Sequence, residues 1–162
     1  MDIDLNFIKN EYFLNKLKNY LERLFRIDKE IKGIILFGSL ARNEEIYSRK
    51  KISDIDIIVI FQDGEIPISH SKRSYLKIKL MGNALSNIDS IWMTKKQFTK
   101  GIDNKMSILL SALYEGKILF DPESLIKEEK KRLFRSLEEK GVKKRKNYWI
   151  WPIKHLGEEI EW

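Results

Sequence analysis

The chain has 162 residues, a length that suits one compact domain with a short appendage. Hydrophobic residues make up 43% of it, enough for a core, which excludes a disordered or collagen-like protein. Cysteine is absent, so disulfide scaffolds, thiolate metal sites and cysteine nucleophiles are excluded as well. The net charge of +7 favours anionic partners without naming one.

The first part of the chain alternates helical and strand-like patterns. Apolar residues spaced by threes and fours predict an amphipathic helix over residues 6–27. The β-branched run Ile31–Phe37 predicts a buried strand that ends in a turn at Gly38-Ser39. Residues 40–46 allow a short helix, and residues 54–61 form the most strand-like segment of the chain.

The same alternation continues to the end of the domain, which predicts an α/β protein built on a sheet. We expect helices over residues 71–85, 95–98 and 106–114, strands over residues 88–93 and 117–120, and a last helix from Asp121-Pro122 to Gly141. From residue 142 the chain changes to a basic run, three aromatic residues and an acidic end. We therefore divide it into a domain of residues 1–141 and a basic, aromatic tail of residues 142–162.

No apolar segment approaches the roughly 20 residues needed to cross a bilayer. The first residues also lack the basic and apolar regions of a secretory signal. We expect a cytoplasmic protein with no membrane partner.

Two acidic residues open the strand of residues 54–61, which is otherwise almost wholly apolar. Because side chains alternate across a strand, Asp54 and Asp56 leave the same face about 7 Å apart. Neighbouring carboxylates repel each other and are costly to bury unless a cation joins them. Oxygen ligands favour Mg²⁺, and two such ions about 4 Å apart can assist a phosphoryl transfer. The pattern therefore predicts a magnesium site.

The turn after the first strand supplies a complementary anion site. Gly38 allows close backbone approach, and Ser39 at a helix start presents N–H groups and a hydroxyl to a phosphate. Arg42, one turn into the expected helix, adds a charged contact to the same phosphates. Asp89 is the sole acid of the third strand. If that strand lies beside the strand of Asp54, Asp89 binds the metal or takes a proton from an acceptor hydroxyl.

Taken together, these residues resemble the minimal nucleotidyltransferases of the DNA polymerase β superfamily over about residues 31–120. The resemblance is carried by Gly38-Ser39-Leu40-Ala41-Arg42, Ser53-Asp54-Ile55-Asp56-Ile57 and Asp89. It implies a mixed sheet flanked by helices, and transfer of a nucleoside monophosphate from ATP or another NTP to an acceptor hydroxyl.

The resemblance also implies roles for individual residues, carried over by position. Gly38, Ser39 and Arg42 would bind the nucleotide. Asp54, Asp56 and Asp89 would be the catalytic acids and would bind two Mg²⁺ ions. The chain departs from the family in having Asn43 where a glycine is usual, and in a longer loop over residues 44–51.

Small members of that family often act beside a helical partner, the HEPN protein of a toxin–antitoxin pair, which some adenylylate on a tyrosine. The resemblance thus implies a HEPN-like partner as the acceptor. Two alternatives stay open. One is a non-catalytic, antitoxin-like subunit that masks such a partner through an exposed apolar face. The other is an accessory protein that binds nucleic acid through the basic run of residues 143–146 and its aromatic neighbours.

The remaining conspicuous residues receive structural interpretations. The apolar residues of the last helix are expected in the core, with contact between copies of the chain in a homo-oligomer as the alternative; they are Leu125, Leu133, Phe134 and Leu137. The two histidines, His70 and His155, are expected at the surface.

Overall fold

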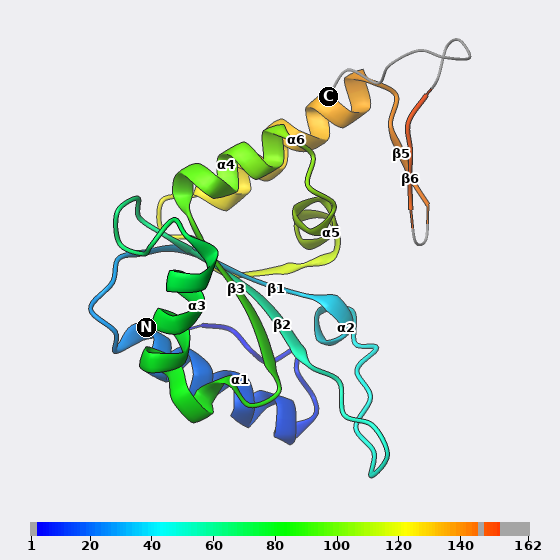
Figure 1. Cartoon of the computed structure of the whole chain (residues 1–162). Coiled ribbons are helices and arrows are strands. Elements are labelled where there is room, and N and C mark those ends of the chain that lie inside the picture. Colours follow the sequence, from blue (N-terminus) through cyan, green and yellow to red (C-terminus); the bar gives the residue numbers. More distant parts are fainter. Residues whose placement is uncertain (1–2, 146–147, 153–162) are drawn as a thin grey trace.

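The computed structural model describes residues 3–145 and 148–152. Its main sheet has four strands in the order β3-β2-β1-β4 (Figure 1). The strands are β1 (Ile31–Phe37), β2 (Ile55–Phe61), β3 (Ile88–Thr94) and β4 (Lys117–Phe120). Because β1 is antiparallel to β2 and β4 whereas β2 and β3 are parallel, the sheet is mixed. The predicted α/β fold with a mixed sheet is confirmed.

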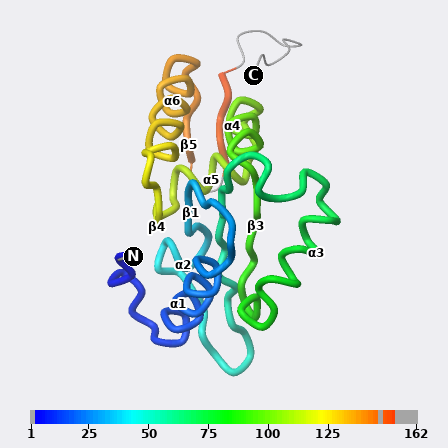
Figure 2. Tube along the Cα trace, turned by 90° about the vertical axis from the view of Figure 1, so that its left-hand side faces the viewer, coloured from blue at the N-terminus to red at the C-terminus, as the bar shows by residue number. Residues whose placement is uncertain are grey.

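Helices cover both faces of this sheet. They are α1 (Glu11–Phe25), α2 (Gly38–Ala41), α3 (His70–Met81), α4 (Lys95–Asp103), α5 (Ser107–Glu115) and α6 (Leu125–Glu139), with a 3₁₀ turn η1 (Gly82–Leu85) after α3. Helices α1 and α3 lie on one side of the sheet and α4, α5 and α6 on the other (Figures 1 and 2). Two apolar layers result, one on each face.

Burial on both faces explains why β1 and β2 are almost continuous apolar runs. Ile57 and Val59 of β2 pack in the layer on the α1 side, whereas Ile58 and Ile60 pack in the layer on the α4–α6 side. By the alternation of side chains, Asp56 shares the face of Ile58 and Ile60. One acid of the predicted site thus points to the α4–α6 side of the sheet.

The start of α1 and the end of α4 differ from the sequence prediction. Helix α1 begins at Glu11 and not at residue 6, because the Asn10 side chain caps it by accepting the backbone N–H of Tyr12. Helix α4 continues to Asp103, well beyond residue 98, and a capping box between Thr94 and Gln97 fixes its start. Such boxes satisfy N–H groups that the first helical turn leaves without partners.

Gly116, which ends α5, has an ordinary extended backbone with a φ of −76° and not the left-handed conformation that is common after a helix. A Cβ atom there would lie 2.2 Å from the Ala112 carbonyl oxygen and 2.8 Å from that of Leu36. Glycine is therefore required for close packing of α5 against β1.

The segment after α6 forms a small hairpin, with β5 (Lys143–Lys144) antiparallel to β6 (Trp149–Ile150). The Trp149 ring packs edge-on against Tyr114 of α5, with 5.3 Å between the ring centroids. The hairpin is thus attached to the α4–α6 side of the domain. The division of the chain at residue 141 stays a prediction, and His155 lies outside the described residues.

Leu125, Leu133 and Leu137 of α6 are buried in the core, as expected, and Phe134 is partly buried against it. Within the described part of the chain, none of the helices has both the length and the apolar character that crossing a bilayer demands.

Candidate active site

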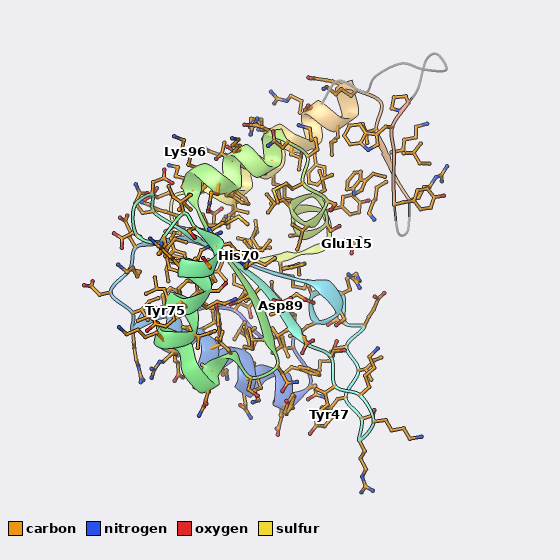
Figure 3. The ribbon with its side chains drawn as sticks, in the orientation of Figure 1. Tyr47, His70, Tyr75, Asp89, Lys96 and Glu115 are labelled. Carbon is orange, nitrogen blue, oxygen red and sulfur yellow. The ribbon has the colours of Figure 1, made fainter. Side chains whose placement is uncertain are left out.

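The parallel pairing of β2 with β3 places two acids side by side. Asp56 is paired in register with Asp89. Both lie on the α4–α6 face, because Met93, two pleats beyond Asp89, belongs to the apolar layer on that side. Asp54 lies one residue before β2 and is exposed. The strand order and register bring the three predicted acids to one end of the sheet. Asp89 lies on the edge strand β3 (Figure 3).

The surroundings of Asp56 disfavour its ionised form. Burial raises the pKa of this carboxyl above its usual range, and the negative charges of Asp89 and Asp54 raise it further. The Arg42 guanidinium acts in the opposite direction but does not cancel the effect. The site therefore carries more negative charge than its own cations balance, and an additional cation would relieve this imbalance.

The turn after β1 touches the same acid. Gly38 has a φ of +72°, in the left-handed region that favours glycine. A Cβ atom on Gly38 would lie only 2.0 Å from Oδ2 of Asp56. The next residue, Ser39, is partly buried, and its carbonyl oxygen accepts the backbone N–H groups of Arg42 and Glu44. Glycine is therefore the only residue type that, at position 38, lets this turn approach the Asp56 carboxylate so closely.

Arg42 stands at a different point of the local structure than predicted. Helix α2 ends at Ala41 and does not run to residue 46, so Arg42 is its C-cap; Asn43 follows in the left-handed conformation with a φ of 57°. Its positive charge nevertheless acts to lower the pKa of Asp56. Its Nε lies 2.8 Å from Oε2 of Glu44.

Glu115 is a site residue that the sequence reasoning missed. Its Oε2 lies 3.0 Å from Nη1 of Arg42, and its Oε1 lies 3.4 Å from Nζ of Lys144. A chain of ion pairs thus joins the turn after β1 to the end of α5 and to the β5–β6 hairpin. The one sequence signal was the position of Glu115 immediately before Gly116, which does not reveal its partners.

A groove runs between α3 and the outer edge of β3, beside Asp89. It encloses a cavity of about 170 Å³. Its lining includes His70, Arg73 and Lys77 of α3, which share one helix face because they are spaced by three and four residues, and Asp89 of β3. His70 is exposed, as predicted, and the two cations carried no predicted role. The helical spacing of these polar residues was the available signal.

The two cations of this groove are bound to neutral groups. Lys77 Nζ donates to the Ser90 carbonyl oxygen at 2.6 Å, and Arg73 Nη1 donates to Gln97 Oε1 at 2.5 Å. Burial lowers the pKa of both side chains from their ordinary values, although the Asp89 charge partly offsets this effect at Lys77.

The spacing of the acids bears on whether they can hold magnesium. Over residues 3–145 and 148–152, no three carboxylate or imidazole side chains stand close enough to hold a metal ion by themselves. Mg²⁺ usually takes only one or two protein carboxylates and completes its shell with water and substrate phosphates. The excess negative charge around Asp56 matches that requirement, so these residues fit a magnesium ion that arrives with a nucleotide.

The family model for Polymerase beta, Nucleotidyltransferase matches residues 15–124, a span that contains every residue of this site. The chain belongs to the polymerase beta nucleotidyltransferase family. None of the curated protein sequences matches it.

Several solved structures resemble this family member in fold. A toxin–antitoxin structure with AMP-PNP is 21% identical, with a TM-score of 0.50; the match covers 77% of this chain and 86% of that one. The toxin–antitoxin MntA–HepT is 20% identical, with a TM-score of 0.47 and coverage of 78% and 87%. A tri-AMPylated Shewanella oneidensis HEPN toxin in complex with MNT antitoxin is 20% identical, with a TM-score of 0.43 and the same coverage.

Proposed function

We propose that this chain transfers AMP from ATP to a hydroxyl group of an acceptor protein. One observation carries the proposal. Asp56, which is paired in register with Asp89, lies against the turn at Gly38, so that negative charge lies directly beside a backbone turn suited to phosphate. Membership of the nucleotidyltransferase family supports the same reaction class.

On this proposal, the turn after β1 holds the triphosphate. Gly38 lets the backbone approach the phosphates, Ser39 offers its hydroxyl and Arg42 offers its guanidinium. Arg42 must then exchange the carboxylates of Glu44 and Glu115 for phosphate oxygens. Arg42 is thus held in ion pairs within the protein until a triphosphate competes for it.

Asp54, Asp56 and Asp89 are the proposed ligands of two Mg²⁺ ions. Bound there, magnesium would offset the charge that develops on the phosphate oxygens during transfer. Asp89, on the outermost strand, is placed to accept the proton of the acceptor hydroxyl. The acceptor oxygen bonds to the α-phosphorus, the bond from that phosphorus to the bridging oxygen breaks, and pyrophosphate leaves with the electron pair.

The similar fold solved as a toxin–antitoxin with AMP-PNP, an ATP analogue, supports ATP as the donor and a toxin as the partner. We extend this pairing to the present chain as part of the proposal. The partner would be a HEPN-like protein, as the sequence resemblance implies.

The test is transfer of label from α-³²P-ATP with magnesium, in a lysate of the source cell and with any protein that co-purifies. Asp54→Asn combined with Asp56→Asn is expected to abolish labelling while leaving the circular dichroism spectrum unchanged. Asp28→Asn, an exposed acid in the loop before β1, is the matched control and should keep full transfer. Labelling that survives the double substitution would contradict the proposed roles of the acids.

A non-catalytic subunit that masks its partner is the second candidate. The observation that favours it is apolar surface at α3 and just before it, where Ile68, Tyr75 and Ile78 are 80%, 70% and 62% exposed. If masking alone is the function, the Asp54→Asn and Asp56→Asn protein will still neutralise the partner in a growth assay. Loss of neutralisation in that protein would instead support catalysis.

A further inference from the structure

We propose that the groove between α3 and the outer edge of β3 receives the acceptor, and that the acceptor is an acidic protein segment that brings a hydroxyl to Asp89. This inference rests on the proposed function and specifies its acceptor. We call the groove, lined by His70, Arg73, Ser74, Lys77 and Asp89, the acceptor groove.

The position of the acceptor groove follows the geometry of the reaction. In an in-line displacement the attacking and leaving oxygens lie on opposite sides of the phosphorus. Across the sheet, the turn at Gly38 ends β1, Asp56 lies on the neighbouring β2, and Asp89 lies on the edge strand β3. Because pyrophosphate leaves toward the turn, the hydroxyl must arrive from the β3 side, where the acceptor groove lies.

Asp89 connects the two halves of this arrangement. It lines the acceptor groove, and its charge also acts on Asp56. A hydroxyl bound in the acceptor groove can therefore lose its proton to the Asp89 carboxylate while its oxygen bonds to the α-phosphorus. The bridging bond to the β-phosphate breaks in the same step, pyrophosphate departs with the electron pair, and the proton passes from Asp89 to solvent.

The charges in the acceptor groove indicate an anionic acceptor. Among the described residues, neither Arg73 nor Lys77 forms an ion pair with a carboxylate, although both are partly buried. Both donate hydrogen bonds to neutral oxygens, those of Gln97 and Ser90. A partly buried cation is costly unless an anion accompanies it. The Asp89 charge offsets part of this cost at Lys77, and carboxylates on an acceptor segment would supply closer partners to both cations.

The size and shape of the acceptor groove favour a protein segment over a nucleic acid. A cavity of about 170 Å³ corresponds to about six water molecules, room for a side chain but not for a nucleotide. Trp92 also lines it but offers no face for a base, because it is only 3% exposed and its ring packs on Phe61 at 4.8 Å between centroids. The edge of β3 can instead pair with an extended peptide.

The outer side of α3 provides further contact area for a protein. Figure 3 places Tyr75 on the side of α3 turned away from His70 and Asp89, and it is exposed with Ile78. A protein can bury these apolar side chains while its acidic segment enters the acceptor groove. A polyanionic nucleic acid would gain little from them.

The experiment measures binding and transfer with the same probe. The probe is a fluorescein-labelled peptide in which one tyrosine is flanked by two glutamates on each side, with a glutamine-flanked peptide as its neutral counterpart. Fluorescence polarisation gives the Kd with magnesium and AMP-PNP present, and α-³²P-ATP gives transfer. The test protein carries Arg73→Gln and Lys77→Gln. The matched control carries Lys72→Gln and Lys79→Gln, which remove the same charge from exposed positions of α3.

We expect the acidic peptide to bind wild-type protein, and the groove substitutions to weaken this binding about tenfold or more. The control substitutions should change the Kd less than threefold. In transfer, the groove substitutions should raise the KM for the peptide while leaving the KM for ATP unchanged. Equal binding of the acidic and neutral peptides, or equal losses in the test and control proteins, would overturn the inference.

Two further outcomes distinguish this inference from a nucleic-acid acceptor and from the proposed catalysis. The first is a single-stranded oligonucleotide that binds more tightly than the acidic peptide and loses affinity with the groove substitutions. That result would overturn the inference that the acceptor is a protein. If the peptide binds in the acceptor groove as expected but no label is transferred under any condition, the proposed catalysis fails while the groove assignment stands.

Discussion

Replacing Gly38 by alanine tests the central contact of the candidate site. Gly38 combines a positive φ of +72° with a backbone that presses on the Asp56 side chain. An added Cβ would lie 2.0 Å from Asp56 Oδ2, whereas ordinary contacts begin at 3.4 Å. The carboxylate must therefore move by about 1.4 Å, the difference between these two distances.

Two separate costs follow from this geometry. The left-handed backbone costs a non-glycine residue about 1–2 kcal/mol in the free energy of unfolding, which corresponds to a fall in Tm of about 2–8 °C for a chain of this size. Displacing a catalytic group by about 1 Å costs about 100-fold in rate, or about 2.7 kcal/mol of transition-state stabilisation. Gly38→Ala should thus lose much more activity than its modest instability explains.

The chain contains a matched control. Gly64 also has a positive φ, of +91°, but a Cβ there would meet no atom within 4 Å. Gly64→Ala should show a similar fall in Tm by differential scanning fluorimetry and nearly full AMP transfer from α-³²P-ATP. If Gly38→Ala transfers AMP within threefold of Gly64→Ala, the position of Asp56 beside the turn has no catalytic importance, and the reasoning fails.

Three other expectations concern the charges and the core. The folded state raises the pKa of Asp56, so ionised Asp56 destabilises the fold above that pKa. Asp56→Asn should therefore raise the free energy of unfolding in urea at about pH 8, with the gain shrinking toward about pH 4; an equal gain at both values would contradict this. Tyr20→Phe leaves the buried Nε1 of Trp92 without its acceptor at 3.1 Å and should cost about 1–3 kcal/mol in the same titration, whereas Tyr75→Phe, on the surface, should cost nothing measurable. Glu115→Gln breaks the ion pairs of Glu115 with Arg42 and Lys144 and should lower the free energy of unfolding by less than about 1 kcal/mol. It should nevertheless speed limited proteolysis of the β5–β6 hairpin. An unchanged cleavage rate would show that these ion pairs do not hold the hairpin.

The sequence predicted the parts of the fold that depend on local pattern. The strands β1, β2 and β3 were found nearly to the residue, because apolar runs that are buried on both faces end at turn residues such as Gly38. That Asp56 shares a face of β2 with Ile58 and Ile60 also follows from alternation alone, whereas the shared face of Asp54 stays a prediction. Helix ends were predicted less well, because side-chain caps such as that of Asn10 decide them.

The contacts between distant segments could not be predicted in this way. That Asp89 stands beside Asp56 depends on strand order and register, which the pattern of either strand alone does not determine. The partner of Arg42, Glu115, lies 73 residues further along the chain. The attachment of the hairpin through Trp149 and Tyr114 likewise became visible only in three dimensions.

The register between β2 and β3 limits where the chain can tolerate insertions and deletions. A shift of β3 by a single position would carry Asp89 through the sheet to the α1 side and put an uncharged residue next to Asp56. Residues added at the exposed positions 68–69, after the buried Ile66, would only lengthen the connection before α3 and leave the pairing intact. Insertions and deletions among natural relatives should therefore accumulate in that connection, while the spacing inside the two strands stays constant.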